Sequence, residues 1–185
     1  MVRNFVRRRV ILFFVAAALV VCAALGLTML SAGGVAAHAA ESHSTSHPGW
    51  TAVPTAGGEL TGGNYYLTGD TPLETDLTVT GTVKLCLNGH VLTGTGTSSV
   101  ITVDGGALTL CDCSTGATNT VAGVEYEGGV LTGGVGTTIG GSYLYGGGIF
   151  VGDGSVFTLE SGTIAGNTAS YGGGVYAGEQ TTLTI

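Results

Sequence analysis

Three cysteines carry the most reactive side chains of this sequence, and their spacing suggests a bond between them. Cys86 lies in a Leu-Cys-Leu segment at residues 85–87, and Cys111 and Cys113 lie in a Leu-Cys-Asp-Cys segment at residues 110–113. If about 25 residues form one turn of a stacked coil, adjacent turns bring these cysteines into disulfide range. We predict a Cys86–Cys111 disulfide, or Cys86–Cys113 if the register slips, with three stacked reduced cysteines as the alternative.

Histidines accompany the cysteines, but the sequence spacing does not predict a metal site. His90 follows an Asn-Gly turn close to Cys86, and three cysteines would need a fourth ligand to bind zinc. His38, His43 and His47 could belong to a metal-binding tract with Trp50 nearby. The Ser- and Pro-containing composition favours a flexible spacer instead, so we predict no metal and no cofactor.

Residues able to catalyse a reaction are also sparse. Asp104, Asp112 and Asp153 stand alone in the sequence, whereas inverting glycosidases need paired carboxylates. A lyase needs a base to remove a proton, and Lys84 is the only Lys or Arg after residue 9. No Gly-x-Ser-x-Gly elbow or phosphate-binding Gly-rich loop with its lysine is present. We therefore predict that the chain is not an enzyme.

A repeat near the carboxyl end indicates how the elements are organised. Residues 145–154 read Tyr-Gly-Gly-Gly-Ile-Phe-Val-Gly-Asp-Gly, and residues 171–180 read Tyr-Gly-Gly-Gly-Val-Tyr-Ala-Gly-Glu-Gln. A period of this length, roughly 26 residues, is typical of stacked units that bury their apolar faces against one another. Gly accounts for 35 of the 185 residues, but without a Gly-X-Y period and with 3 Pro, so collagen is excluded.

Alternating apolar and Thr or Ser residues predict short β-strands between glycine-rich corners. The residues 59–185 are therefore expected to form an all-β parallel β-helix, a solenoid in which each residue lies beside its counterpart one turn later. The expected inward ladder pairs Ile149 with Val175, Val151 with Ala177, Phe157 with Leu183, and Leu159 with Ile185. Phe150 and Tyr176 would form an outward aromatic ladder.

The amino-terminal segment has the features of an export signal. Four arginines precede an apolar run over residues 10–30, and Ala-His-Ala at residues 37–39 is typical of a cleavage site. We predict a hydrophobic signal helix within residues 1–39, with an uncleaved membrane anchor as the alternative, and a flexible linker over residues 40–58. Either way the remainder is expected to be secreted or on the cell surface.

Removing this segment leaves a strongly acidic chain. All four arginines lie within residues 1–39, so the formal net charge changes from −7 to −11 when they leave. Binding to nucleic acid requires Lys and Arg contacts to phosphate, which excludes that class of partner. Contact with a membrane is expected only through an uncleaved amino-terminal segment.

Several segments resemble the repeats of bacterial cell-surface right-handed parallel β-helix proteins, which share the fold of pectate lyases. They are Leu-Cys-Leu-Asn-Gly-His at 85–90, Val-Ile-Thr-Val at 100–103, Gly-Ala-Leu-Thr-Leu-Cys-Asp-Cys at 106–113, Tyr-Gly-Gly-Gly-Ile at 145–149 and Ser-Gly-Thr-Ile-Ala-Gly-Asn at 161–167. The Gly-rich segments are loosely similar to repeats of polymorphic outer-membrane proteins. The resemblance implies a right-handed coil and an adhesin-like function.

The expected function is a non-catalytic adhesin or stalk fragment that binds host or cell-surface glycans or proteins. The alternative is a fragment of a polysaccharide lyase or hydrolase whose catalytic turns lie outside this chain. The repeat stops within a turn, so we expect truncation at the carboxyl end and self-association through an open strand edge.

Overall fold

The computed structural model describes residues 35–38, 43 and 45–185. The signal segment is predicted for residues 1–39, and of these the structure describes only residues 35–38. The chain divides into two units, Met1–Ala32 and Gly33–Ile185, and all of the described residues lie in the second. Strands and turns form the regular structure of the described residues, so the prediction of an all-β chain with parallel strands is confirmed.

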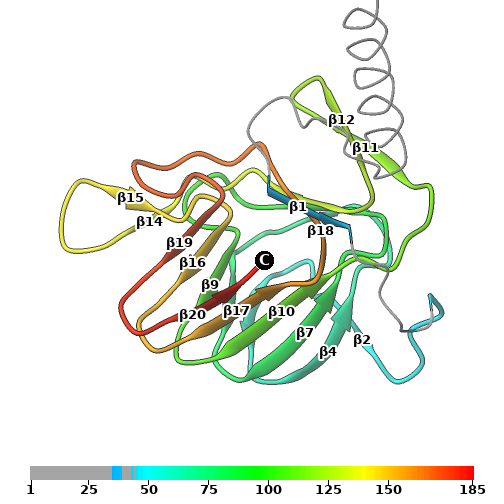
Figure 1. Cartoon of the computed structure of the whole chain (residues 1–185), viewed down its shortest axis with the longest axis horizontal. Coiled ribbons are helices and arrows are strands. Elements are labelled where there is room, and N and C mark those ends of the chain that lie inside the picture. Colours follow the sequence, from blue (N-terminus) through cyan, green and yellow to red (C-terminus); the bar gives the residue numbers. More distant parts are fainter. Residues whose placement is uncertain (1–34, 39–42, 44) are drawn as a thin grey trace, which may run out of the picture. The chain divides into compact units, whose positions relative to one another are not determined.

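Three sheets contain most of the strands (Figure 1). Sheet A contains β5 (Thr71–Pro72), β8 (Val91–Thr93), β13 (Val130–Thr132) and β18 (Ser161–Ile164), with β1 (Val35–His38) added at one edge. Sheet B contains β2 (Thr51–Ala52), β4 (Gly63–Tyr66), β7 (Thr82–Cys86), β10 (Ala107–Cys111), β17 (Val156–Leu159) and β20 (Thr182–Thr184). Sheet C contains β3 (Gly58–Leu60), β6 (Leu77–Val79), β9 (Ile101–Val103), β16 (Ile149–Val151) and β19 (Val175–Ala177).

The chain visits these sheets in a constant order. From β3 onward it passes through sheet C, then sheet B, then sheet A, and each return adds a parallel strand next to the previous one. Short strands separated by glycine corners allow this path because glycine adopts the positive φ angles that the corners need. Gly105 and Gly154, for example, have φ of 69° and 72° at corners that lead into β10 and β17.

Strand register places equivalent residues of the repeat side by side. Ile149 pairs with Val175, Val151 with Ala177, and Phe157 with Leu183. Leu159 pairs with Leu110 on its other side. The expected pairing of Leu159 with Ile185 falls beyond β20, which ends at Thr184.

The apolar core lies along the inner faces of the three sheets. In strands such as β6, β9 and β16 every second side chain is buried; in β9, Ile101 and Val103 are buried on either side of half-buried Thr102. On the ladder, Ile149, Val151, Phe157 and Leu159 are buried, and Val175 and Ala177 pack partly buried against the core. Leu183 and Ile185 are 45% and 59% exposed.

Two antiparallel hairpins depart from this pattern in the region where the sequence loses its regular spacing. One pairs β11 (Thr118–Val121) with β12 (Val124–Glu127), and the other pairs β14 (Thr137–Thr138) with β15 (Leu144–Tyr145). Both are insertions between strands that belong to the parallel sheets. Figure 1 shows them extending away from those sheets.

The amino-terminal part of the described chain also joins the sheets. β1 pairs antiparallel with β18, opposing Val35 to Ile164 and His38 to Ser161. β2 lies within the range predicted as a linker, residues 40–58, and pairs parallel with β4. Pairing of β2 gives this segment backbone hydrogen-bond partners that the composition does not reveal.

Candidate functional site

Two aromatic side chains lie side by side on the outer face of sheet C. Phe150 and Tyr176 pair in register between β16 and β19, and their rings are 5.6 Å apart with planes inclined by 7°. Because alternate residues of a strand point to opposite faces, the buried positions of Ile149 and Val151 force Phe150 outward. The repeat therefore produces the outward aromatic pair that the sequence predicts.

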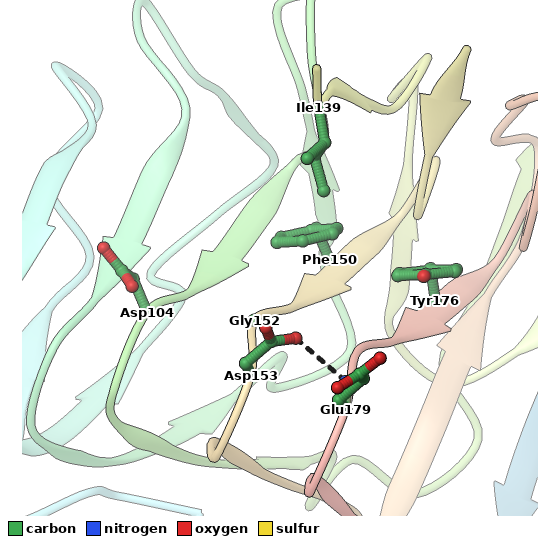
Figure 2. A pocket seen from close by; sticks show the side chains of 7 residues that line it. All are labelled: Asp104, Ile139, Phe150, Gly152, Asp153, Tyr176 and Glu179. Atoms are coloured by element: carbon green, nitrogen blue, oxygen red, sulfur yellow. Dashed lines mark hydrogen bonds between the residues drawn. The ribbon is translucent and has the colours of Figure 1, made fainter. Parts of the chain in front are cut away.

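An open depression of about 500 Å³ surrounds these rings. Its lining combines apolar and acidic side chains: Asp104, Ile139, Phe150, Gly152, Asp153, Tyr176 and Glu179. Figure 2 shows the two rings between Ile139 on one side and the carboxylates of Asp153 and Glu179 on the other. The site thus offers flat apolar surface next to exposed hydrogen-bond acceptors.

The acidic residues come from corners that follow successive strands of sheet C. Asp104 follows β9, Asp153 follows β16, and Glu179 follows β19. The Glu179 amide donates a hydrogen bond of 2.8 Å to Asp153 Oδ1, drawn in Figure 2, which ties two neighbouring corners together. Asp104 and Asp153 stand apart in the sequence, and the stacking of turns brings both to one depression.

A second group of tyrosines continues the aromatic surface. The rings of Tyr145 and Tyr171 are 5.2 Å apart and nearly parallel, at 17°. Tyr145 also meets Tyr176 edge-on at 4.9 Å, and Tyr143 meets Tyr171 at 5.6 Å. Tyr143 and Tyr171 are 57% and 50% exposed. Aromatic rings that remain this accessible form a surface suited to contact with a ligand.

The cysteines lie together at the ends of strands in sheet B. Cys86 ends β7 and pairs in register with Cys111, which ends β10. All three described cysteines are buried, and none of them is in a disulfide bond. The Sγ atoms of Cys86 and Cys113 are 3.3 Å apart, a longer distance than the roughly 2.05 Å of a disulfide bond. The structure thus brings Cys86 and Cys111 side by side on neighbouring strands, and a disulfide among the three cysteines stays a prediction.

Two histidines from the amino-terminal segment complete this cluster. The Nε2 atom of His47 is 3.4 Å from Cys113 Sγ and 3.3 Å from His43 Nε2. One ligand atom from each of His43, His47, Cys86 and Cys113 lies within 4.8 Å of all the others. The sequence gives no sign of this grouping, because the four residues come from three separate passes of the chain.

Aromatic stacking holds the two imidazoles in place. The His47 ring stacks on Tyr66 at 4.4 Å and 10°, and the His43 ring stacks on Trp50 at 4.6 Å and 21°. A β-turn over residues 47–50, closed by a 3.1 Å hydrogen bond from the Trp50 amide to the His47 carbonyl, sets their spacing. Pro48 and Gly49, with φ of 78° at Gly49, are the residues that such a turn prefers.

The two close sulfurs differ in acidity. Hydrogen bonding, with the largest contribution from the Cys111 side chain, lowers the pKa of Cys86 to about 4, although burial acts in the opposite direction. Burial, followed by the hydrogen bond and the charge of Cys86, raises the pKa of Cys113 to about 12. Of the two sulfurs, Cys86 is therefore the one that loses its proton more readily.

Lys84, the sole candidate base of the folded sequence, forms an ion pair instead. Its ammonium group lies 2.7 Å from Glu160 Oε2 on the outer side of sheet B. A paired ammonium group is poorly suited to abstract a proton.

The described part of the chain holds no helix with the length and apolarity needed to cross a membrane. No protein-family model matches the sequence, and no curated protein or solved structure matches it either.

Proposed function

We propose that the chain is a secreted or cell-surface right-handed parallel β-helix that binds glycans without catalysing a reaction. The observation that carries this proposal is the aromatic surface of Phe150 and Tyr176 beside the exposed carboxylates of Asp153 and Glu179. The C–H faces of sugar rings pack on aromatic rings, and sugar hydroxyls donate hydrogen bonds to carboxylates. Both partners are present in one open depression.

The arrangement of strands supports the coiled architecture in this proposal. The constant order of sheets C, B and A, with parallel pairing at each return, is what a parallel β-helix requires. Such a coil repeats its outer surface at each turn, so a long ligand can contact equivalent residues on successive turns. This favours a polymer, such as a host or cell-surface polysaccharide, over a small molecule.

Export is part of the same proposal. The arginines and apolar run of residues 3–30 are typical of a signal peptide or an anchor, and the remainder is strongly acidic. An adhesin or stalk at the cell surface fits this combination.

Glycan binding can be tested with the purified protein on an array of polysaccharides and glycoproteins. We expect retention of at least one neutral or basic glycan, and Phe150→Ala or Tyr176→Ala should weaken that binding about tenfold or more because the flat apolar surface is lost. The matched control is Tyr126→Ala, since Tyr126 lies in β12 outside the depression. No retention of any glycan, or equal losses with all three variants, would refute the proposal.

Polysaccharide hydrolysis is the competing function, favoured by the gathering of Asp104, Asp153 and Glu179 around one depression. Paired carboxylates are the catalytic groups of most glycosidases. Release of new reducing ends from a polysaccharide, abolished by both Asp153→Asn and Glu179→Gln, would establish hydrolysis. Binding without release of reducing ends would favour the adhesive function.

A further inference from the structure

We propose that His43, His47, Cys86 and Cys113 form a tetrahedral zinc site that fastens the amino-terminal segment to sheet B. This inference is independent of the glycan surface, which lies on sheet C. It differs from the sequence-based prediction of no metal site, and it rests on the geometry, burial and chemistry of these four side chains.

The distances within the cluster agree with those between ligands of one zinc ion. Zn–N bonds of about 2.0–2.1 Å and Zn–S bonds of about 2.3 Å place tetrahedral ligand atoms roughly 3.3–3.8 Å apart. The observed 3.3 Å between the two Nε2 atoms and 3.4 Å from Cys113 Sγ to His47 Nε2 lie within this range, whereas the Cys86 and Cys113 sulfurs, at 3.3 Å, are closer than the roughly 3.8 Å between two sulfurs on one zinc ion. All four ligand atoms lie close enough to surround a single ion.

The ligand types also select zinc. A tetrahedral set of two sulfur and two nitrogen ligands is characteristic of structural zinc. Two thiolates neutralise the charge of Zn²⁺, so the complete site would carry no net charge. Neutrality matters here because Cys86 is fully buried, and His47 and Cys113 are 3% and 8% exposed.

One buried polar atom of this cluster has no hydrogen-bond partner. His47 Nδ1 is the buried side-chain nitrogen or oxygen in the described residues that has no hydrogen-bond partner. The other ring nitrogen of His47 faces a sulfur and a second imidazole nitrogen. A metal bond to Nε2 would replace these two contacts and would leave Nδ1 as the protonated ring nitrogen, still without a partner.

Neighbouring residues hold the ligands in the orientation that the site needs. Tyr66 and Trp50 support the two imidazole rings, and the turn over residues 47–50 sets the backbone beside them. Asp112 anchors the backbone next to Cys113, with its amide donating a 2.7 Å hydrogen bond to Ser161 Oγ. Cys111 interacts with Cys86 and is the one described cysteine outside the ligand set.

Four protein ligands leave no open position for a substrate, so the site is structural. Its effect would be to join His43 and His47 to two successive turns of the chain, one containing Cys86 and the next containing Cys113. The disulfide predicted from the sequence would have joined only those two turns, without the amino-terminal segment. The zinc ion would also secure β2, which begins at Thr51, shortly after His47.

Metal content gives the direct test, with the full protein carrying no histidine tag. We expect one zinc ion per chain by elemental analysis and native mass spectrometry. Replacing zinc with Co²⁺ should give the intense visible absorption of tetrahedral cobalt together with thiolate-to-cobalt charge transfer. Octahedral cobalt absorption, or failure of the reduced protein to bind either ion at equimolar concentration, would overturn the proposal.

Variants then identify the ligands. Cys113→Ser and His47→Gln should each weaken zinc binding by more than about 100-fold, since even supporting residues of metal sites contribute 10–100-fold. Cys111→Ser is the matched control, because it alters a buried cysteine of the same cluster and should retain zinc. The reverse result, with zinc lost only in Cys111→Ser, would refute the assigned ligands.

Two further measurements keep the test decisive if a ligand variant folds poorly. Removing zinc from the unmodified protein with a chelator should increase amide hydrogen exchange around residues 51–53 at least tenfold, because Val53 and β2 pair with β4. Alkylation of the unfolded protein before mass spectrometry should find four reactive thiols in the full chain, or three if the segment that contains Cys22 has been removed. The proposal would be contradicted if the purified protein contained no zinc and kept a Cys86–Cys113 disulfide.

Discussion

Asp112 connects three parts of the chain through one buried carboxylate. Its Oδ1 accepts a 2.6 Å hydrogen bond from the Gly89 amide, and its Oδ2 accepts bonds from the Gly129 amide at 2.9 Å and the Ser114 hydroxyl at 2.6 Å. The carboxylate thus satisfies backbone donors of the Asn-Gly turn and of the segment entering β13. This role explains why an acidic residue separates Cys111 from Cys113.

Replacing Asp112 should therefore destabilise the fold. Asp112→Ala leaves the two amides without their acceptor, and each unpaired buried donor costs about 1–3 kcal/mol. We expect the free energy of unfolding, measured by urea denaturation, to fall by about 3 kcal/mol. Asp104→Ala is the control, since Asp104 is exposed and should change stability by less than about 0.5 kcal/mol. Equal stability of the two variants would contradict this role.

Side-chain chemistry can be predicted from the sequence only where it depends on nearby residues. Asn167 follows Ile-Ala-Gly, a setting typical of a corner, and its side chain does bond the Gly134 amide and the Leu131 and Ala165 carbonyls. The cluster of His43, His47, Cys86 and Cys113 escapes such a prediction. Its members come from distant parts of the sequence, and no short spacing signals a shared site.

At the scale of elements, the glycine triplets of the repeat lie against one another. The Gly146 amide donates to the Tyr171 carbonyl and the Gly147 amide to the Gly172 carbonyl, both at 3.0 Å. A Cβ atom on Gly147 would lie 2.2 Å from the Gly173 carbonyl oxygen, which is closer than any real contact. The triplet recurs because two backbones approach closely at this corner.

A methyl group at this position should separate the two turns. We expect Gly147→Ala to lower the free energy of unfolding by about 1–3 kcal/mol, the range for overpacked sites. Gly141→Ala is the matched control, because a Cβ atom there would meet no other atom within 4 Å. Thermal unfolding followed by circular dichroism compares the two variants, and a Gly147→Ala protein as stable as the control would disprove the close approach.

The periodic elements are predictable from the sequence, and the insertions are not. The recurring Tyr-Gly-Gly-Gly motif identifies the pairing of Ile149 with Val175 because apolar residues return at the same places in each turn. The hairpins β11–β12 and β14–β15 interrupt this period between residues 114 and 145, where no spacing remains to follow. β2 escapes prediction because so short a strand leaves no alternation to recognise.

At the scale of the whole unit, sheets B and C end in strands with one unpaired edge. Among the described strands, β20 pairs only with β17, and β19 pairs only with β16. Leu183 and Ile185 leave apolar surface exposed beside the edge of β20. Exposed strand edges of this kind pair readily with another chain.

We therefore expect concentration-dependent self-association of the purified chain, measured by light scattering. Leu183→Lys should reduce it severalfold, because a charge beside the edge opposes pairing between chains. Ile139→Lys is the control, since Ile139 is similarly exposed, at 48%, but lies away from β20. A protein that stays monomeric at every concentration, or equal effects of the two substitutions, would contradict association through this edge.

The position of Lys84, paired with Glu160, affects how readily a protease can digest the protein. Proteases of the trypsin class cut after Lys or Arg, and Lys84 is the single such residue beyond position 9. It lies inside β7, between β4 and β10, with its side chain held at 2.7 Å from Glu160. Digestion at that bond requires β7 to leave its sheet, so the lifetime of the protein in trypsin-rich surroundings depends on how readily this region opens.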